Sequence, residues 1–250
     1  VDVTADFLQP GTILVLHEHN SKTRISQIDP GGNLLGRIEV ANGYGESHLA
    51  LTNQYIFYSD AFNQTIWCYD RTGLLIHAIK TDTHPTPAVS QIVPDFNNQS
   101  IFFIDQFNGL KTIRQLDNPR TGSSTVFITA PDYTGLIVLQ DLFMGSVEGQ
   151  EKCLYALCIT HPDFGLSRLL KIDEGGNAEY IDSEHFELPY VYDVGSVAVD
   201  PANGNVFVAT TTKVVRFNSK SDPLGFFEFN DIHPSIEVDR SDFVAQCGRR

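Results

Sequence analysis

Basic residues are scarce in this sequence of 250 residues. Lysine and arginine together number 17, against 31 aspartates and glutamates, which gives a formal net charge of −14. Proteins that bind nucleic acid through its phosphates need clustered lysines and arginines, and anionic lipid surfaces attract the same clusters. The composition therefore argues against nucleic acid as a partner and favours a partner of positive charge.

Long apolar runs are absent as well. None approaches the roughly 18 residues that a membrane-spanning helix requires, and Val1 to Thr4 do not resemble a signal peptide. We expect no membrane insertion within this segment, and a removed signal or an anchor beyond Arg250 stays open. Helical periodicity is also missing along the chain, which leaves strands as the expected elements.

Cysteine is scarce, and its spacing suits no zinc site. Cys153 and Cys158 lie five residues apart in one expected strand, so their side chains point to opposite faces and do not bond to each other. Pairings with Cys68 or Cys247 stay open. We predict no metal site, no cofactor and no catalytic residue.

What the sequence does contain is an internal repeat. Five segments rich in β-branched and aromatic residues follow one another, at residues 12–16, 55–60, 100–105, 153–157 and 205–209. If Ile13, Ile56, Ile101, Leu154 and Val206 are equivalent, the steps between them are 43, 45, 53 and 52 residues. A period of this size is typical of one propeller blade per repeat.

Each repeat continues with a second strand that ends near an aspartate or asparagine, a turn with glycine and a third strand. A further strand precedes every repeat except the first, at residues 48–52, 88–93, 138–143 and 195–200. We expect residues 242–247 to complete the first sheet, with residues 2–7 as the competitor. The prediction is a single all-β domain, 1–250: a β-propeller of five four-stranded antiparallel blades closed by a terminal strand, with six blades as the alternative.

Two stretches resemble known propeller repeats. Residues 55–60, with Ile66 and the turn at 70–73, resemble the YWTD repeat of lipoprotein-receptor propellers, and residues 100–105 are a similar second copy. Residues 196–209 are similar to NHL and gluconolactonase-like repeats, in propellers of the TolB-like superfamily type. The resemblance implies a rigid platform that binds another protein through one face, in a secreted or membrane-anchored setting.

In propellers of this kind, the loops after the second and the outermost strand of each blade open on one face. That assignment places seven of the eight histidines on or near one acidic face, which we predict to bind a protein. The predicted partner-binding residues are Tyr44, His48, His84, Tyr133, His161, His185, Phe186, Tyr190, Tyr192 and His233. Imidazoles titrate between about pH 5 and 8, so acidification would weaken binding of a basic partner. The alternative is that these loops are simply polar and tolerate histidine.

Two sequons add a modest indication of an extracellular or secretory location. They begin at Asn63 and Asn98, and both are expected in turns, where a glycan could be accommodated.

The alternative function is a calcium-dependent lactonase or esterase of the gluconolactonase-like type. The resemblance implies an acidic metal ligand directly before a glycine, but Val194 stands before Gly195, and only Asp193 and Asp200 remain nearby. Asp200 is more simply a turn residue before Pro201. The other carboxylates are expected to bond neighbouring backbone amides, at strand ends for Asp60, Asp105 and Asp141 and at turns on the opposite side for Asp29, Asp70, Asp117 and Asp173.

Overall fold

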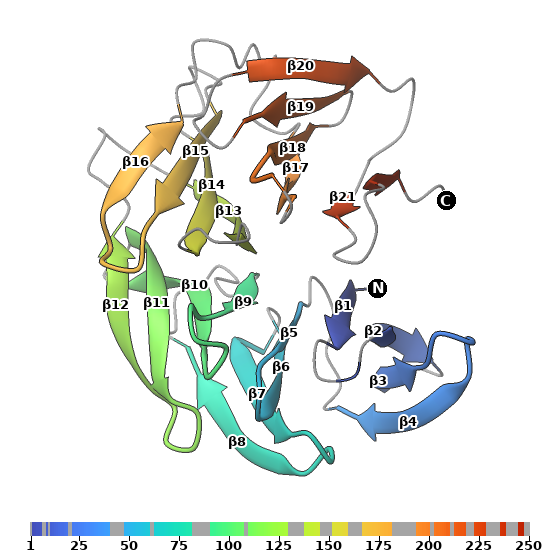
Figure 1. Ribbon diagram of the computed structural model, residues 1–250. Helices are drawn as coiled ribbons and strands as arrows, with labels where there is room; N and C mark the ends of the chain where they lie inside the picture. The colour runs from blue at the N-terminus through green and yellow to red at the C-terminus, as the bar shows by residue number, and fades with distance from the viewer. Residues whose placement is uncertain are drawn as a thin grey trace. The chain divides into compact units, whose positions relative to one another are not determined.

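A computed structural model gives the fold of the chain (Figure 1). It describes residues 2–6, 9, 11–19, 22–40, 48–60, 63–81, 91–107, 110–129, 138–145, 152–159, 167–181, 194–200, 203–210, 213–218, 223–228, 236–238 and 245–247. The chain divides into two compact units, residues 1–129 and 130–250.

The first unit contains three four-stranded antiparallel sheets, in each of which the strands lie in sequence order. Their strands are β1 (Asp2–Asp6), β2 (Thr12–His19), β3 (Lys22–Ile28) and β4 (Leu34–Glu39); β5 (Leu49–Leu51), β6 (Tyr55–Asp60), β7 (Thr65–Asp70) and β8 (Leu75–Lys80); and β9 (Ile92–Pro94), β10 (Ile101–Phe107), β11 (Leu110–Asn118) and β12 (Ser123–Thr129).

The second unit contains two further sheets of the same kind and a two-stranded sheet. Their strands are β13 (Val138–Gly145), β14 (Cys153–Ile159), β15 (Ser167–Ile172) and β16 (Ala178–Ile181); β17 (Val194–Val199), β18 (Val206–Thr210), β19 (Lys213–Phe217) and β20 (Pro223–Glu228); and β21 (Ile236–Val238) with β22 (Ala245–Cys247). The described residues contain no helix, and accordingly none that could cross a membrane.

The strand pairing confirms the repeat inferred from the sequence. Ile13, Ile56 and Leu154 each pair with the residue directly before a turn aspartate, namely Ile28, Tyr69 and Ile172. Within the first unit the first strands of successive sheets lie next to each other, β1 by β5 and β5 by β9, and in the second unit β13 lies by β17. Four-stranded antiparallel blades whose first strands lie side by side, three in the first unit and two in the second, are typical of a β-propeller.

The strand that completes the first sheet is the N-terminal one. β1 pairs with β2 from Asp2 opposite Leu16 to Asp6 opposite Thr12. The preferred prediction of residues 242–247 was wrong, because Ala245–Cys247 pairs with β21 instead. Antiparallel pairing needs only a neighbouring chain with free backbone groups, so the sequence pattern alone did not distinguish the two terminal segments.

The core of the first unit lies between its sheets, and β6 shows why. All six residues of β6 are buried: Ile56 and Tyr58 pack towards the first sheet, and Tyr55 and Phe57 pack towards the third. A strand that is covered on both faces needs a continuous apolar run rather than alternation, which is what residues 55–58 supply.

The turns between the third and fourth strands join neighbouring sheets in the first unit. Gly73, at φ 90°, lies so close to the first sheet that an added Cβ would be 2.8 Å from Ile38 Cγ1. Gly122, at φ 72°, lies in the same way against β8, where a Cβ would be 3.1 Å from His77. Glycine is required at both positions, because positive φ and a close approach both disfavour a side chain.

Two predicted turn positions were wrong by a few residues. In the third sheet the turn is capped by Asn118 rather than Asp117, because a register shift between Leu116 and Asn118 inserts a residue. Gly225 lies inside β20 at φ 130° instead of in the turn, opposite Arg216 and next to another register shift. Such bulges place glycine within a strand.

Candidate functional site

His48 is the one predicted partner-binding residue that the structure describes. Its backbone carbonyl accepts a hydrogen bond of 2.9 Å from Ser59 N, and its backbone N donates to Ser59 Oγ at 3.0 Å. His48 therefore lies where β5 begins and where β6 and β8 finish, which we call the loop end of the sheets. The predicted residues outside the described part of the chain are Tyr44, His84, Tyr133, His161, His185, Phe186, Tyr190, Tyr192 and His233.

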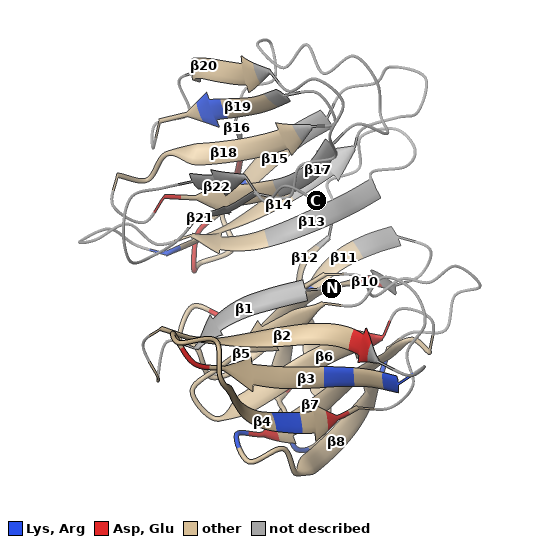
Figure 2. Cartoon of the chain, turned by 90° about the vertical axis from the view of Figure 1, so that its right-hand side faces the viewer, with Lys and Arg blue, Asp and Glu red and all other residues tan. Residues whose placement is uncertain are grey.

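Charged residues lie at the loop end of the first sheet, in β2, β3 and β4, where Figure 2 colours them blue and red. Glu39 forms ion pairs with Lys22 at 3.4 Å and Arg24 at 3.1 Å. These two cations lower the pKa of Glu39, the charge of Lys22 first. His17 Nε2 lies 2.8 Å from Ser26 Oγ in the same sheet. Because Lys22 and Glu39 are exposed, these ion pairs form a charged surface rather than a buried centre.

Asp60 is one of the carboxylates predicted at strand ends, and it bonds a neighbouring backbone amide as expected. Asp60 is fully buried, and it accepts hydrogen bonds from the backbone N of Asn63 at 3.0 Å and from Asn63 Nδ2 at 2.6 Å. Asp105 is also buried and lies 3.9 Å from Arg114 Nη1. The prediction of a strand-end position was wrong for two of the three, because Asp105 lies inside β10 and Asp141 lies inside β13.

A groove of about 430 Å³ lies between the second and third sheets. Its described lining carries charges of both signs and two apolar side chains; the residues are Ile79, Lys80, Thr81, Phe103, Asp105, Arg114, Gly122 and Ser124. Two bonds to Ser124 hold the guanidinium of Arg114, and Lys80 Nζ donates to Thr65 Oγ1 at 2.8 Å. This β8–β12 groove reaches the loop end at Thr81, directly before residues 82–90, which include His84.

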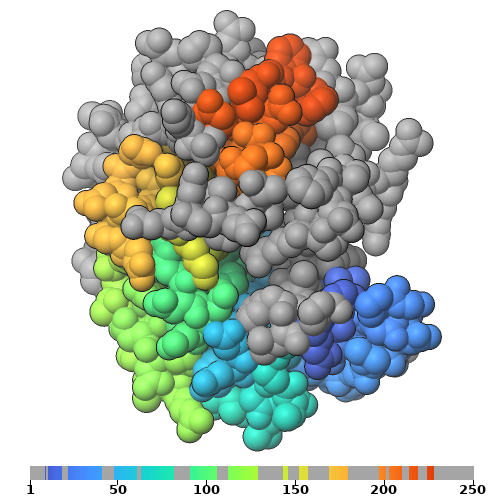
Figure 3. All heavy atoms as spheres, in the orientation of Figure 1, coloured from blue at the N-terminus to red at the C-terminus, as the bar shows by residue number. Residues whose placement is uncertain are grey.

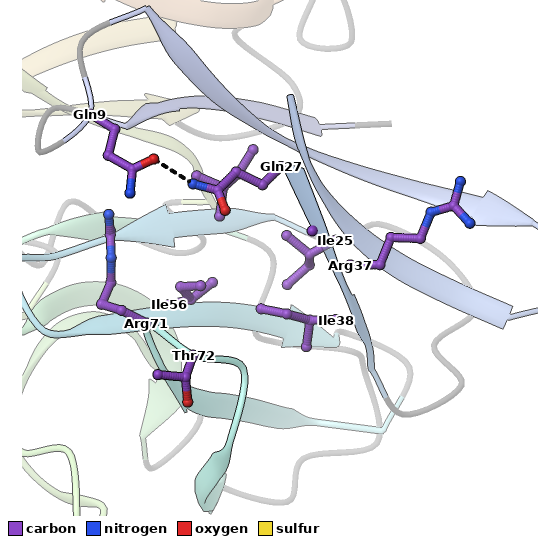
Figure 4. A pocket seen from close by; sticks show the side chains of 10 residues that line it. Gln9, Ile25, Gln27, Arg37, Ile38, Ile56, Arg71 and Thr72 are labelled. Carbon is purple, nitrogen blue, oxygen red and sulfur yellow. Dashed lines mark hydrogen bonds between the residues drawn. The ribbon is translucent and has the colours of Figure 1, made fainter. Parts of the chain in front are cut away.

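A smaller pocket of about 190 Å³ lies between the first and second sheets at the opposite end, the turn end (Figure 4). Leu14, Ile25, Ile38 and Ile56 form its apolar part. Its described polar lining consists of Gln9, Gln27, Arg37, Arg71 and Thr72. Gln27 Nε2 donates to Gln9 Oε1 at 3.0 Å, and Arg71 Nη1 donates to the carbonyl of Thr52 at 3.4 Å. We call this the Gln9–Arg71 pocket.

The turn aspartates are structural, as predicted. Asp29 and Asp173 each accept bonds from the backbone N and the side-chain amide of the asparagine four residues later, and Asp70 bonds Thr72 and the backbone N of Leu74. These bonds, those from the side chains first, lower the pKa of all three carboxyl groups. A carboxylate that accepts several hydrogen bonds is stabilised in its charged form.

Asp200 is also a turn residue. Its Oδ2 accepts from Asn203 Nδ2 at 2.6 Å, and its backbone carbonyl accepts from Gly204 N at 2.8 Å. Asp193, the other acidic residue considered as a metal ligand, lies outside the described residues. Across the part of the chain that is described, no three His, Cys, Asp or Glu side chains are grouped so that they could hold a metal ion.

Both sequon asparagines lie in turns. Asn63 is exposed, in the turn between β6 and β7, whereas Asn98 is half-buried and has a φ of 53°. Cys68 is a fully buried free thiol, so it takes no part in a disulfide.

Comparisons with known proteins bear on the fold. No protein-family model and no curated protein sequence matches the chain. Solved structures do match it over nearly its whole length. A streptogramin B lyase aligns at a TM-score of 0.63 and 16% identity, over 93% of this chain and 70% of the lyase. The fold is that of a β-propeller.

Two further solved structures also match the chain. A chain in a crystal structure of a nidogen/laminin complex aligns at a TM-score of 0.59 and 13% identity, over 91% of this chain and 79% of the other. A functionally unknown protein from Desulfotomaculum acetoxidans DSM 771 aligns at 0.57 and 12% identity, over 90% and 70%. The predicted resemblance to YWTD and NHL-like propellers is thus confirmed at the level of the fold.

The sequence reasoning missed the residues of both cavities. Lys80 and Arg114 were treated only as strand residues, and Arg71 only as part of a turn. Each cavity is lined by residues of two repeats: Lys80 and Asp105 both line the groove, and Gln9 and Arg71 both line the pocket. Aligning the repeats would show that Arg71 replaces Pro30 and Glu174 after the turn aspartate, and this is the one signal that the sequence offered.

Proposed function

We propose that the chain is a protein-binding propeller that contacts its partner through the loop end of its sheets. The observation that carries the proposal is the β8–β12 groove, which reaches this end at Thr81 and offers Lys80, Arg114 and buried Asp105 beside Phe103. Its volume of about 430 Å³ is enough to receive side chains of a partner. His48 lies at the same end of the second sheet.

The charge of the whole chain, rather than that of the groove, favours a basic protein as the partner. The chain has a formal net charge of −14, and such a field attracts positively charged partners and speeds their association. Protonation of the histidines would reduce that field, so binding should weaken below neutral pH. The predicted aromatic anchors are Tyr190 and Tyr192, in the segment that joins β16 to β17.

A defined test is selection from a displayed peptide library against the immobilised chain at about pH 7.4. We expect the selected peptides to be rich in lysine and arginine, and to dissociate at about pH 5.5. The double variant Tyr190→Ala/Tyr192→Ala should bind them at least about tenfold more weakly while its thermal unfolding stays unchanged.

A matched control is Leu35→Ala/Leu74→Ala, which removes two exposed leucines away from the loop end. It should bind the selected peptides as the original chain does. Peptides that bind the tyrosine variant equally well, or that are insensitive to pH, would contradict the proposed surface.

We place this function outside the cell. The support is the occurrence of the same fold in the nidogen/laminin complex and the exposed position of Asn63 within its sequon. Expression through a secretory pathway should yield a glycan at Asn63 that peptide N-glycosidase removes and that Asn63→Gln abolishes, with Asn98→Gln as the companion variant. An unmodified secreted chain would contradict this placement.

The alternative of a calcium-dependent lactonase or esterase has weaker support. Of the two carboxylates that the sequence left as candidate ligands, Asp200 is engaged by its own turn. A stoichiometric calcium content in the purified chain, together with hydrolysis of a lactone, would favour the enzyme over the binding module.

A further inference from the structure

We propose that β20 pairs edge to edge with the same strand of a second copy of this chain. Figure 1 shows β20 as the outermost strand of the sheet β17–β20, and Figure 3 shows orange-red atoms of this part of the chain at the surface. Among the described residues, only β19 pairs with β20. A strand at the edge of a sheet presents backbone N–H and C=O groups that can pair with a further strand.

The side chains of β20 are apolar although they are exposed. Leu224 is 43% exposed, Phe226 59% and Phe227 56%. Because Phe226 and Phe227 are adjacent in the strand, each of its two faces exposes an aromatic side chain. Charges ordinarily protect a sheet edge from other strands, as Arg37 does on β4, but residues 223–227 carry none.

Two-fold symmetry restricts how two copies of β20 can pair. Antiparallel partners direct their backbone groups at each other, and these groups alternate in direction along a strand. The two residue numbers of a pair must therefore be both odd or both even where the strand is regular, as β20 is from Gly225 to Glu228. An axis centred on Phe226 meets this condition, and it places Phe227 of each copy opposite Gly225 of the other.

Gly225 suits an aromatic ring from the second copy. A Cβ built at Gly225 would meet nothing within 4 Å, so the space beside its Cα is open. An aromatic side chain that covers a glycine on the neighbouring strand stabilises such a pair. Moving the axis by one residue would place glycine opposite glycine or Phe226 opposite Glu228, so the axis at Phe226 is favoured.

The exposed apolar area predicts a weak dimer. A phenylalanine side chain has about 200 Å² of surface, so the exposed parts of Leu224, Phe226 and Phe227 amount to roughly 250–300 Å² per copy. Two copies together would bury about half of the roughly 1,200 Å² at which stable interfaces begin. We therefore expect a Kd on the order of 0.1–1 mM.

Salt should strengthen this dimer. Each copy carries a formal net charge of −14, whereas residues 223–227 are uncharged, so the rest of the chain supplies the repulsion between copies. Raising NaCl from about 0.05 to about 0.5 M screens that repulsion and should lower the Kd several-fold. A basic partner would bind more weakly under the same change, which distinguishes this inference from the proposed function.

The test is sedimentation velocity of the full chain between about 10 μM and about 1 mM, in about 0.5 M NaCl. We expect the sedimentation coefficient to rise with concentration towards that of a dimer. Phe227→Lys should raise the Kd at least about tenfold, because it places a charge in the paired edge. The matched control Leu75→Lys adds the same charge to β8, where Leu75 is 46% exposed, and should dimerise as the original chain does.

A cysteine cross-link tests the register even if Phe227→Lys fails to fold. Position 226 lies opposite itself across the axis, so oxidation of Phe226→Cys should join two copies through a disulfide. Phe227→Cys, which lies opposite Gly225, should cross-link several-fold less. The original chain, with its own four cysteines, gives the background.

A chain that stays monomeric at about 1 mM would overturn the proposal, as would a dimer that Phe227→Lys leaves unchanged or that Leu75→Lys weakens equally. Cross-linking that favours Phe227→Cys over Phe226→Cys would overturn the register. None of these measurements involves another protein, so the proposed protein-binding function is tested separately.

Discussion

At the scale of single residues, the turn glycines Gly32 and Gly73 offer a direct comparison. Each has positive φ, 80° and 90°, and each donates its backbone N–H to the carbonyl of the turn aspartate. A Cβ at Gly32 would meet nothing within 4 Å, whereas one at Gly73 would meet Ile38. The two positions therefore share the backbone requirement and differ only in the contact between sheets.

We expect Gly32→Ala to lower the free energy of unfolding by about 1–2 kcal/mol, the cost of left-handed backbone for alanine. Gly73→Ala should cost on the order of 1–3 kcal/mol more, because β4 must move to admit the methyl group. Urea unfolding of the two variants measures the difference. Equal losses of unfolding free energy in the two variants would show that the turn does not pack tightly against Ile38.

Cys68 gives a second residue-scale prediction. Burial, and then the charge of Asp70, raises the pKa of its thiol to about 12. The thiolate is the reactive form, so Cys68 should resist alkylation in the native chain near neutral pH and react once the chain unfolds. Mass spectrometry after iodoacetamide treatment, with and without urea, locates the modification. Rapid labelling of Cys68 in the native chain would contradict its burial.

At the scale of strands and turns, most of the fold could be predicted from the sequence. Runs such as residues 55–58 and 101–104 are apolar throughout because sheets cover both of their faces, and the aspartates that end the third strands mark the turns. What the sequence could not supply were contacts between repeats. The edge partner of β2, the bulge at Asn118 and both cavities depend on which neighbouring chain is present, and local patterns carry no such information.

The turn aspartates should make stability depend on pH. The folded pKa values of Asp29, Asp70 and Asp173 are lowered, while in the unfolded chain they return to about 3.9. Their stabilisation is therefore complete above about pH 4 and is lost as the pH falls through the folded values. The triple variant Asp29→Asn/Asp70→Asn/Asp173→Asn should lose less stability than the original chain between about pH 6 and about pH 3, measured by urea midpoints. Parallel losses would contradict this origin.

At the scale of the whole molecule, the acidic charge governs encounters with partners. Adding eight histidine charges to −14 leaves −6, so even full protonation of the histidines keeps the chain acidic. Acidification should therefore weaken attraction to a basic partner without reversing it. The loops expected to make the contact lie largely outside the described residues, so the site, unlike the fold, still rests on sequence reasoning and on His48.

Salt provides the corresponding test. Association of the chain with the lysine-rich peptides from the library should slow several-fold between about 0.05 and about 0.5 M NaCl, because the screening length falls well below about 10 Å. Surface plasmon resonance measures this rate, and dissociation should change less. An association rate that does not change with salt would contradict long-range electrostatic attraction between the chain and its partner.

The contact between Gly73 and Ile38 recurs between Gly122 and β8. We call this glycine-to-strand contact the joint, and it affects how a repeat can be added to such a chain by gene duplication. The second sheet carries both halves of the joint: Gly73 in its own turn packs on Ile38 of the first sheet, and His77 on β8 receives Gly122 of the third. A gene segment that is copied in tandem therefore brings both halves of the joint with it, and the new copy can dock on the old without any prior mutation. Loops at the other end are not part of this joint, which leaves them to diverge from copy to copy.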